Sequence, residues 1–284
     1  MIDETLEAEF ALRKRHPERD TIYDEHKRRS AIVRAESACI LDQRYAAGPR
    51  CLLDIFSAGD RAPVLLFIHG GYWRALDKSY VSFIAEPFRK AGITVVMPGY
   101  DLVPGIRVGG IVDQMRLALD WIVNRLTPER IVVSGHSAGG QLAAMLALDQ
   151  AVRGEGPIVG LAAVSGAFDL RPLLRTSINA DLNLSAEEAA EASPLLRVKA
   201  LMGGAALVPL LGVVGGDETQ GFKQWTADLV SAWRARGAPA KLCEIAGRNH
   251  FTILDALAAS DGDLANRICE LAFGSTGAGL PAMQ

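Results

Sequence analysis

Residues 131–148, IVVSGHSAGGQLAAMLAL, decide the fold of this chain. A short β-branched run, 131–133, leads into the pentapeptide 135–139, which has the G-x-S-x-G pattern around Ser137. An alanine- and leucine-rich helix is predicted to follow. Such a strand–turn–helix holds its serine in a strained conformation, and its glycines are needed because a Cβ there would meet the strand or the helix. Ser137 is therefore a candidate nucleophile at the positive end of a helix. The alternative is a tight turn with an inert serine.

Apolar strands and amphipathic helices alternate on both sides of this stretch. A fully apolar run such as 64–68, VLLFI, is typical of a strand that is buried on both faces. The pattern therefore predicts an α/β protein with a mostly parallel sheet covered by helices on both faces. The predicted strands are 51–56, 64–68, 94–97, 131–134, 158–164, 207–214 and 241–245, and the predicted helices are 79–91, 111–126, 138–151, 224–236 and 255–272.

Composition limits the class of protein. A chain of 284 residues can bury one large core, and its formal net charge of −3 gives no sign of a nucleic-acid surface. The four cysteines include no C-x-x-C pair and are expected to be reduced. The N-terminus is acidic, with no signal sequence, and no uninterrupted apolar run is long enough to span a membrane. A soluble, cytoplasmic protein is expected.

Three parts of unequal size are predicted. Residues 1–45 are heavily charged and are expected to form a helical or irregular arm that either roofs the site or is a solvated face. Residues 46–273 form the main domain, and a polar, alanine-rich insertion at about 168–205 interrupts its alternation and is interpreted as a partial lid. Residues 274–284 are expected to be a flexible tail.

A second glycine-rich segment, HGGYW at 69–73, directly follows the buried strand 64–68. Its glycines allow the N–H groups of Gly70 and Gly71 to turn toward one point, where the N–H of Ala138 could join them. Three such donors would stabilise the oxyanion of a tetrahedral intermediate. The aromatic pair Tyr72 and Trp73 could pack an aromatic leaving group or could equally be core filling.

A serine hydroxyl needs a base, and the sequence has five histidines. His16 and His26 lie in the charged arm, His69 belongs to the glycine-rich loop, and His136 is expected to point away from the turn. His250 remains, on a loop between the last predicted strand and the last predicted helix.

The acid that orients this base should follow the preceding strand, since the expected chain order is serine, carboxylate, histidine. The predicted strand 207–214 is followed by Gly-Gly-Asp-Glu, so Asp217 and Glu218 are the two candidates. Asp169, after the strand 158–164, is a more distant third.

With these residues in place, the chain resembles the α/β-hydrolase superfamily and, within it, the kynurenine formamidase (arylformamidase) type related to hormone-sensitive-lipase-like esterases. The resemblance spans roughly residues 40–272, and it rests on HGGYW at 69–73, GHSAGG at 135–140, SGAFDL at 165–170, ASPLL at 192–196, GGDETQGF at 215–222 and NHF at 249–251.

The resemblance implies a triad of Ser137, Glu218 and His250. Glu218 stands where the family usually has aspartate, four residues before the phenylalanine that matches Phe222. This departure in residue type leaves Asp217 open. The resemblance also implies a serine hydrolase that cleaves an N-formyl arylamine such as N-formylkynurenine.

The sequence is also consistent with other functions. Relatives of this type also hydrolyse esters, other amides or carbamates, and a non-catalytic binding protein on the same fold is a further alternative. No H-x-H or H-E-x-x-H pair is present, so neither a metal nor a cofactor is expected. The expected partner is a small aromatic amide or ester, with no nucleic acid and no membrane, and the formation of a homodimer is left open.

Overall fold

The computed structural model describes residues 1–259 and 262–274. Its centre is one eight-stranded sheet in the order β1-β2-β4-β3-β5-β6-β7-β8, in which β1 and β2 run antiparallel to their neighbours and β3 to β8 are mutually parallel. The strands are β1 Cys39–Arg44, β2 Leu52–Phe56, β3 Val64–Ile68, β4 Thr94–Pro98, β5 Ile131–His136, β6 Ile158–Val164, β7 Leu210–Gly215 and β8 Ala240–Ile245.

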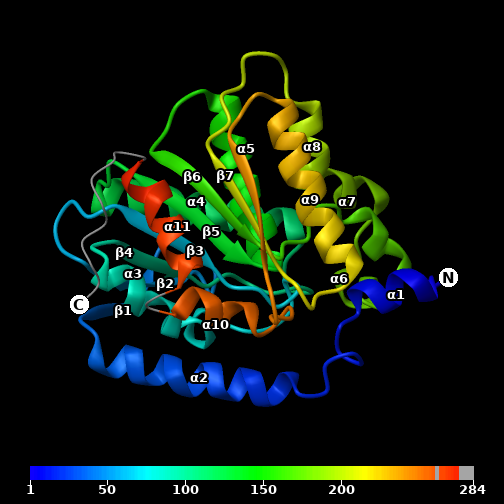
Figure 1. The fold of residues 1–284 in the computed structure, drawn as a ribbon, viewed down its shortest axis with the longest axis horizontal. Helices are drawn as coiled ribbons and strands as arrows, with labels where there is room; N and C mark the ends of the chain where they lie inside the picture. The colour runs from blue at the N-terminus through cyan, green and yellow to red at the C-terminus, as the bar shows by residue number, and fades with distance from the viewer. Residues whose placement is uncertain (260–261, 275–284) are drawn as a thin grey trace.

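Helices cover both faces of this sheet, as the alternation predicts (Figure 1). The α-helices are α1 Glu4–Phe10, α2 Arg19–Glu36, α3 Ala85–Lys90, α4 Val108–Leu126, α5 Ala138–Arg153, α6 Asn179–Leu182, α7 Ala186–Glu191, α8 Pro194–Ala200, α9 Gln220–Ala235, α10 Ile253–Ala258 and α11 Asp263–Phe273. Short 3-10 turns occupy Lys78–Tyr80, Ser82–Ile84 and Arg171–Arg175.

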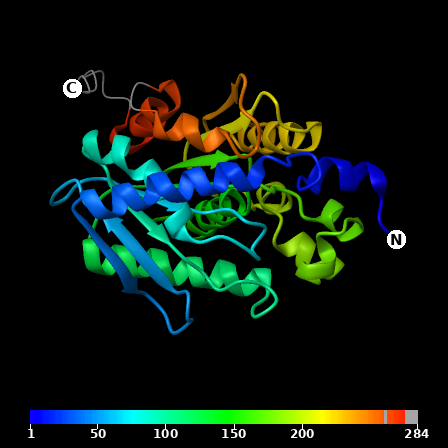
Figure 2. The same ribbon diagram turned by 90° about the horizontal axis from the view of Figure 1, so that it is seen from below.

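The two faces carry two separate hydrophobic clusters. Side chains of α4, α5 and α9 pack on one face against residues such as Leu66 and Val133. Side chains of α3, α10 and α11 pack on the other face against Leu65 and Val132, which are the adjacent residues of the same strands. Alternate residues of a strand point to opposite faces, so a strand enclosed by two helical layers must be apolar throughout. Figure 2 shows the sheet between these layers.

Several predicted boundaries differ from the structure. The predicted helix 79–91 is two 3-10 turns followed by α3, and the predicted closing helix 255–272 is the two helices α10 and α11. β1 was not predicted, so the sheet begins inside the segment assigned to the arm. β1 is an edge strand whose residues alternate between intermediate and exposed, and this weak apolar signal is hidden among charges.

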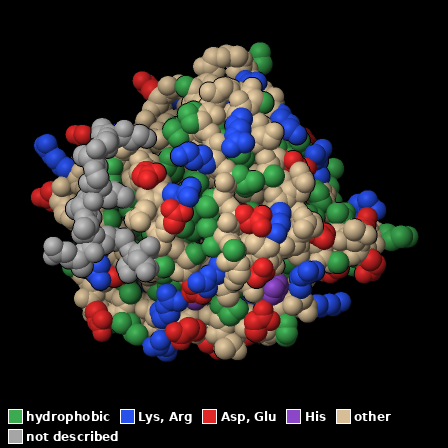
Figure 3. Space-filling model, in the orientation of Figure 1, with side chains coloured by type: hydrophobic (Ala, Val, Ile, Leu, Met, Phe, Trp, Pro, Cys, Tyr) green, Lys and Arg blue, Asp and Glu red, His purple; other side chains and the backbone are tan. Residues whose placement is uncertain are grey.

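The predicted insertion contains the 3-10 turn Arg171–Arg175 and the short helices α6, α7 and α8. The predicted tail, 274–284, lies outside the described residues beyond Gly274. On the face drawn in Figure 3, acidic and basic side chains alternate. Within residues 1–259 and 262–274, no helix is long and apolar enough to cross a membrane.

Candidate active site

Ser137 lies on the tight turn between β5 and α5, with φ +55° and ψ −119°. Two close approaches show why glycines flank it. A Cβ on Gly135 would lie 2.2 Å from the Gly139 carbonyl oxygen, and a Cβ on Gly139 would lie 2.0 Å from that of Ile68. The turn is therefore compressed against β3, and it holds Ser137 in the left-handed region that only a well-supported backbone can keep. The residue itself is 3% exposed.

His250 and Glu218 meet at the same edge of the sheet, 32 residues apart in the chain. The Nδ1–H of His250 donates to Oε2 of Glu218 over 2.7 Å, and both side chains are buried. Because Nδ1 holds the proton of the neutral ring, Nε2 is left with the free lone pair that a general base requires. The loop after β8 is fixed by Asn249, whose side-chain oxygen accepts the N–H groups of Phe251 and Thr252, both over 2.9 Å.

Glu218 is held by three donors altogether. Its Oε1 accepts the Ser165 hydroxyl over 2.5 Å and the Gly215 N–H over 2.8 Å, in addition to His250 on the other oxygen. A buried carboxylate needs such partners, because burial of an unpaired charge is costly. Asp217, the other candidate acid, is exposed. The third candidate, Asp169, pairs instead with Arg171 over 2.6 Å.

His136 occupies a different place from the one predicted. Its ring does not point away from the site, since its centroid lies 4.7 Å from that of His250 and its Nε2–H donates to the His250 carbonyl over 2.8 Å. Burial, reinforced by the neighbouring His250, holds the pKa of His136 well below its usual 6.5. It therefore stays neutral and ties the base loop to the serine turn.

The glycine-rich loop after β3 lies directly against Ser137. A Cβ on Gly70 would be 3.1 Å from the Cβ of Ser137. Among the described residues, the N–H groups of Gly70, Gly71 and Ala138 donate to no protein acceptor. Buried N–H groups are nearly always paired, so unpaired ones beside a serine are suited to bind a ligand oxygen.

The aromatic pair that follows this loop differs in its two members. Trp73 is fully buried and donates its indole N–H to Gln141 over 3.1 Å, so it is core filling and offers no surface to a substrate. Tyr72 is only partly enclosed, and its hydroxyl donates to the Phe10 carbonyl over 2.8 Å.

The N-terminal arm packs over these loops. Phe10 stacks on Trp225 with ring centroids 4.1 Å apart, and the Thr219 hydroxyl donates to the Glu9 carbonyl over 2.9 Å. Further along, Tyr23 and the ring of His16 each contact Phe251, next to His250. α2 then crosses the edge of the sheet where the parallel strands end (Figure 2). Of the two interpretations of this segment, the roof is the one that the contacts favour.

Two residues at this edge were not singled out from the sequence. Ser165 follows β6 and binds Glu218, and Tyr100 stands two residues after β4 beside His69. Both positions could have been found, because the carboxyl ends of neighbouring parallel strands meet at one edge. In the described part of the chain, no group of three His, Cys, Asp or Glu residues is arranged to hold a metal ion.

A fold of this kind, with a serine on a strained strand–helix turn and a hydrogen-bonded histidine–carboxylate pair whose histidine ring contacts the residue before that serine, defines a class. The model of the alpha/beta hydrolase fold matches residues 65–254, and the chain belongs to this family. It is a hydrolase.

The similar proteins narrow this class. The chain is 29% identical to the kynurenine formamidase of Salmo salar, over 81% of this chain and 80% of the relative. It is 28% identical to the kynurenine formamidase of Danio rerio, over 79% of each. A solved structure from a Silicibacter species, whose name suggests a thioesterase, superposes with a TM-score of 0.77 at 29% identity and covers 88% of this chain and 93% of its own.

Proposed function

We propose that this hydrolase is arylformamidase-like and cleaves an N-formyl arylamine, such as N-formylkynurenine, into formate and the free amine. The hydrogen bond between His250 and Glu218, with the His250 ring against His136 of the serine turn, carries the proposal of a serine mechanism. The formyl substrate is supported by the similarity to kynurenine formamidases over about four fifths of both chains. The low exposure of Ser137 fits a formyl group, which is the smallest acyl group.

The proposed reaction has two halves. Ser137 Oγ attacks the formyl carbon while His250 Nε2 takes its proton, and the N–H groups of Gly70, Gly71 and Ala138 bind the oxyanion. The C–N bond then breaks, His250 passes the proton to the amine nitrogen, and a formyl ester remains on Ser137. Water attacks this ester with His250 as base, and formate leaves.

Substrate comparison tests the proposal. We expect kcat/KM for N-formylkynurenine to exceed that for short-chain p-nitrophenyl esters, measured side by side by product absorbance.

Ser137→Ala should lower kcat by about 10⁶, because members of a triad act as a unit. A loss under tenfold would exclude Ser137 as the nucleophile. A strong preference for esters would instead favour the second candidate, a carboxylesterase.

We further propose a cytoplasmic location. All four cysteines are unpaired, and burial raises the pKa of each thiol, which makes them inert structural residues. Unpaired thiols are typical of reducing compartments. Cell fractionation followed by detection of the protein tests this location, and recovery in a secreted fraction would contradict it.

A further inference from the structure

Tyr100 lies against the glycine-rich loop and contacts it through both its ring and its hydroxyl. It is fully buried, and its ring stacks on that of His69 with centroids 4.3 Å apart and planes 7° from parallel. Its hydroxyl faces two backbone carbonyls of the loop, at 3.0 Å from the His69 oxygen and 3.3 Å from the Gly70 oxygen. Burial raises the pKa of this phenol, so it keeps its proton and remains a donor.

The ring of His69 also forms a hydrogen bond to the same loop. Its Nδ1 lies 2.8 Å from the Gly70 carbonyl oxygen, and since a carbonyl can only accept, Nδ1 must hold the proton. Within the described residues its buried Nε2 has no partner, which agrees with this tautomer. Burial lowers the pKa of His69 to about 4, so the ring stays neutral near pH 7.

These hydrogen bonds fix the direction of the N–H groups of Gly70 and Gly71, although neither N–H group is itself bonded to Tyr100 or to the His69 ring. In a trans peptide unit the C=O and the N–H point in opposite directions. The His69 carbonyl is drawn toward Tyr100, so the N–H of Gly70 points the other way. The Gly70 carbonyl is drawn toward both rings, so the N–H of Gly71 also points away from them.

Ser137 lies against Gly70, and the N–H groups of Gly70 and Gly71 lack a protein acceptor in the described chain. We propose that Tyr100, with His69 stacked on it, is a positioning residue that sets the oxyanion donors Gly70 and Gly71 before substrate arrives. The inference rests on the proposed function, since it concerns how the same site stabilises its transition state. Donors aimed in advance stabilise a developing charge without reorganising during the reaction.

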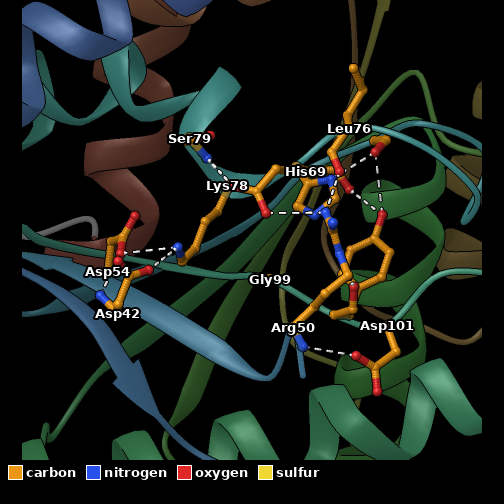
Figure 4. Close-up of polar contacts among 12 residues, drawn as sticks. Asp42, Arg50, Asp54, His69, Leu76, Lys78, Ser79, Gly99 and Asp101 are labelled. Carbon is orange, nitrogen blue, oxygen red and sulfur yellow. Dashed lines mark hydrogen bonds and ion pairs between the residues drawn. The ribbon is translucent and has the colours of Figure 1, made fainter. Parts of the chain in front are cut away.

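Tyr100 is itself held firmly. Arg50 donates from Nε to the Tyr100 carbonyl over 3.1 Å and from its terminal nitrogen to the Leu76 carbonyl over 2.5 Å, farther along the same loop. Lys78, two residues after Leu76, forms ion pairs with Asp42 over 2.6 Å and with Asp54 over 3.3 Å. Figure 4 shows Lys78 pointing toward Asp42 and Asp54, and Arg50 beside Asp101.

Tyr100→Phe tests the proposal, because it keeps the stacked ring and removes only the hydroxyl. We expect kcat to fall tenfold to a hundredfold while KM changes less than threefold, since the bound substrate gains little from the oxyanion donors. Affinity for an aryl trifluoromethyl ketone, which forms a tetrahedral adduct on a nucleophilic serine, should fall by the same factor as kcat/KM. A purely structural role would not move this affinity.

Tyr45→Phe is the matched control. The Tyr45 hydroxyl also donates to one backbone carbonyl, that of Gly99, over 2.7 Å, and it has no bond to the glycine-rich loop. Both variants should lower Tm to a similar extent, and only Tyr100→Phe should lower kcat. Equal kcat values in the two variants, or unchanged affinity for the ketone, would overturn the proposal.

A second variant and a labelling experiment complete the test. If Tyr100→Phe does not fold, His69→Phe keeps the stack and removes the donor to Gly70, and an unchanged kcat there would overturn the proposal. Labelling of the wild type by a fluorophosphonate separates the two ideas. If Ser137 is labelled and Tyr100→Phe leaves kcat unchanged, only the positioning role is overturned. If the wild type is not labelled, the serine mechanism itself is overturned.

Discussion

The loops that carry the proposed triad and the N-terminal arm that covers them are held in different ways. Each loop follows a strand of the sheet and is fixed by buried hydrogen bonds, such as those that Glu218 accepts from Ser165 and Gly215. The arm is attached by scattered contacts, among them the Phe10 stack and the bond from Tyr72 to the Phe10 carbonyl. Reactive groups need a rigid support, whereas a cover that must admit substrate is better attached by contacts that can open.

The largest expected effect concerns the loops. Glu218→Gln should lower kcat by about 10⁴, since an amide can present its N–H to Nδ1 of His250 and stabilise the wrong tautomer of the base. Asp217→Asn is its matched control, one residue away on the same turn, and should leave kcat within twofold because Asp217 is exposed. Steady-state kinetics on both variants decides between the two carboxylates. A larger loss in Asp217→Asn would reverse the assignment of the acid.

The next effect concerns the arm. Phe10 is 3% exposed, so Phe10→Ala should reduce the free energy of unfolding by about 3 kcal/mol through the cavity it leaves against Trp225. kcat should fall less than tenfold, because the ring touches no reacting atom. Urea unfolding and steady-state kinetics measure the two quantities.

Ile2→Ala is the control for this change. Ile2 lies on the same arm but is 49% exposed, so its removal should change stability by less than about 0.5 kcal/mol. A loss of kcat in Phe10→Ala as large as that in Glu218→Gln would show that arm and loops act as one unit, and the contrast between them would fail.

The same contrast explains how much the sequence could predict. The turn at Ser137 depends on neighbours in the chain, and its glycines mark it in the sequence, as the compression of Gly139 against Ile68 illustrates. The strands that support the site are apolar runs, and β6, Ile158–Val164, has the predicted bounds. Strong local patterns therefore predicted the central sheet and the placement of the candidate residues on its loops.

Features that depend on distant parts of the chain were less accessible. The choice of Glu218 over Asp217 as the partner of His250 follows from which side chain turns inward, where Ser165, 53 residues earlier, binds it. The buried ring of His136 and the core position of Trp73 likewise depend on neighbours that no local pattern reveals. β1 was missed because an edge strand buries little, and pairing with β2 supplies its stability instead.

The smallest expected effect tests whether water is excluded from the loops that carry the proposed triad. Burial depresses the pKa of His136, so the unfolded chain takes up a proton below about pH 6.5 that the folded chain does not. Stability from this residue is therefore complete above pH 6.5 and is lost as pH falls, by about 1.4 kcal/mol for each unit. His136→Gln keeps a donor for the His250 carbonyl and should reduce the measured slope by this amount, while the contribution of buried His69 remains. The slope is measured by urea unfolding between pH 6.5 and 5.5, with pH 7.5–8.5 as the internal control. An unchanged slope would mean that His136 is protonated in the folded protein and that water reaches the loops as readily as it reaches the arm.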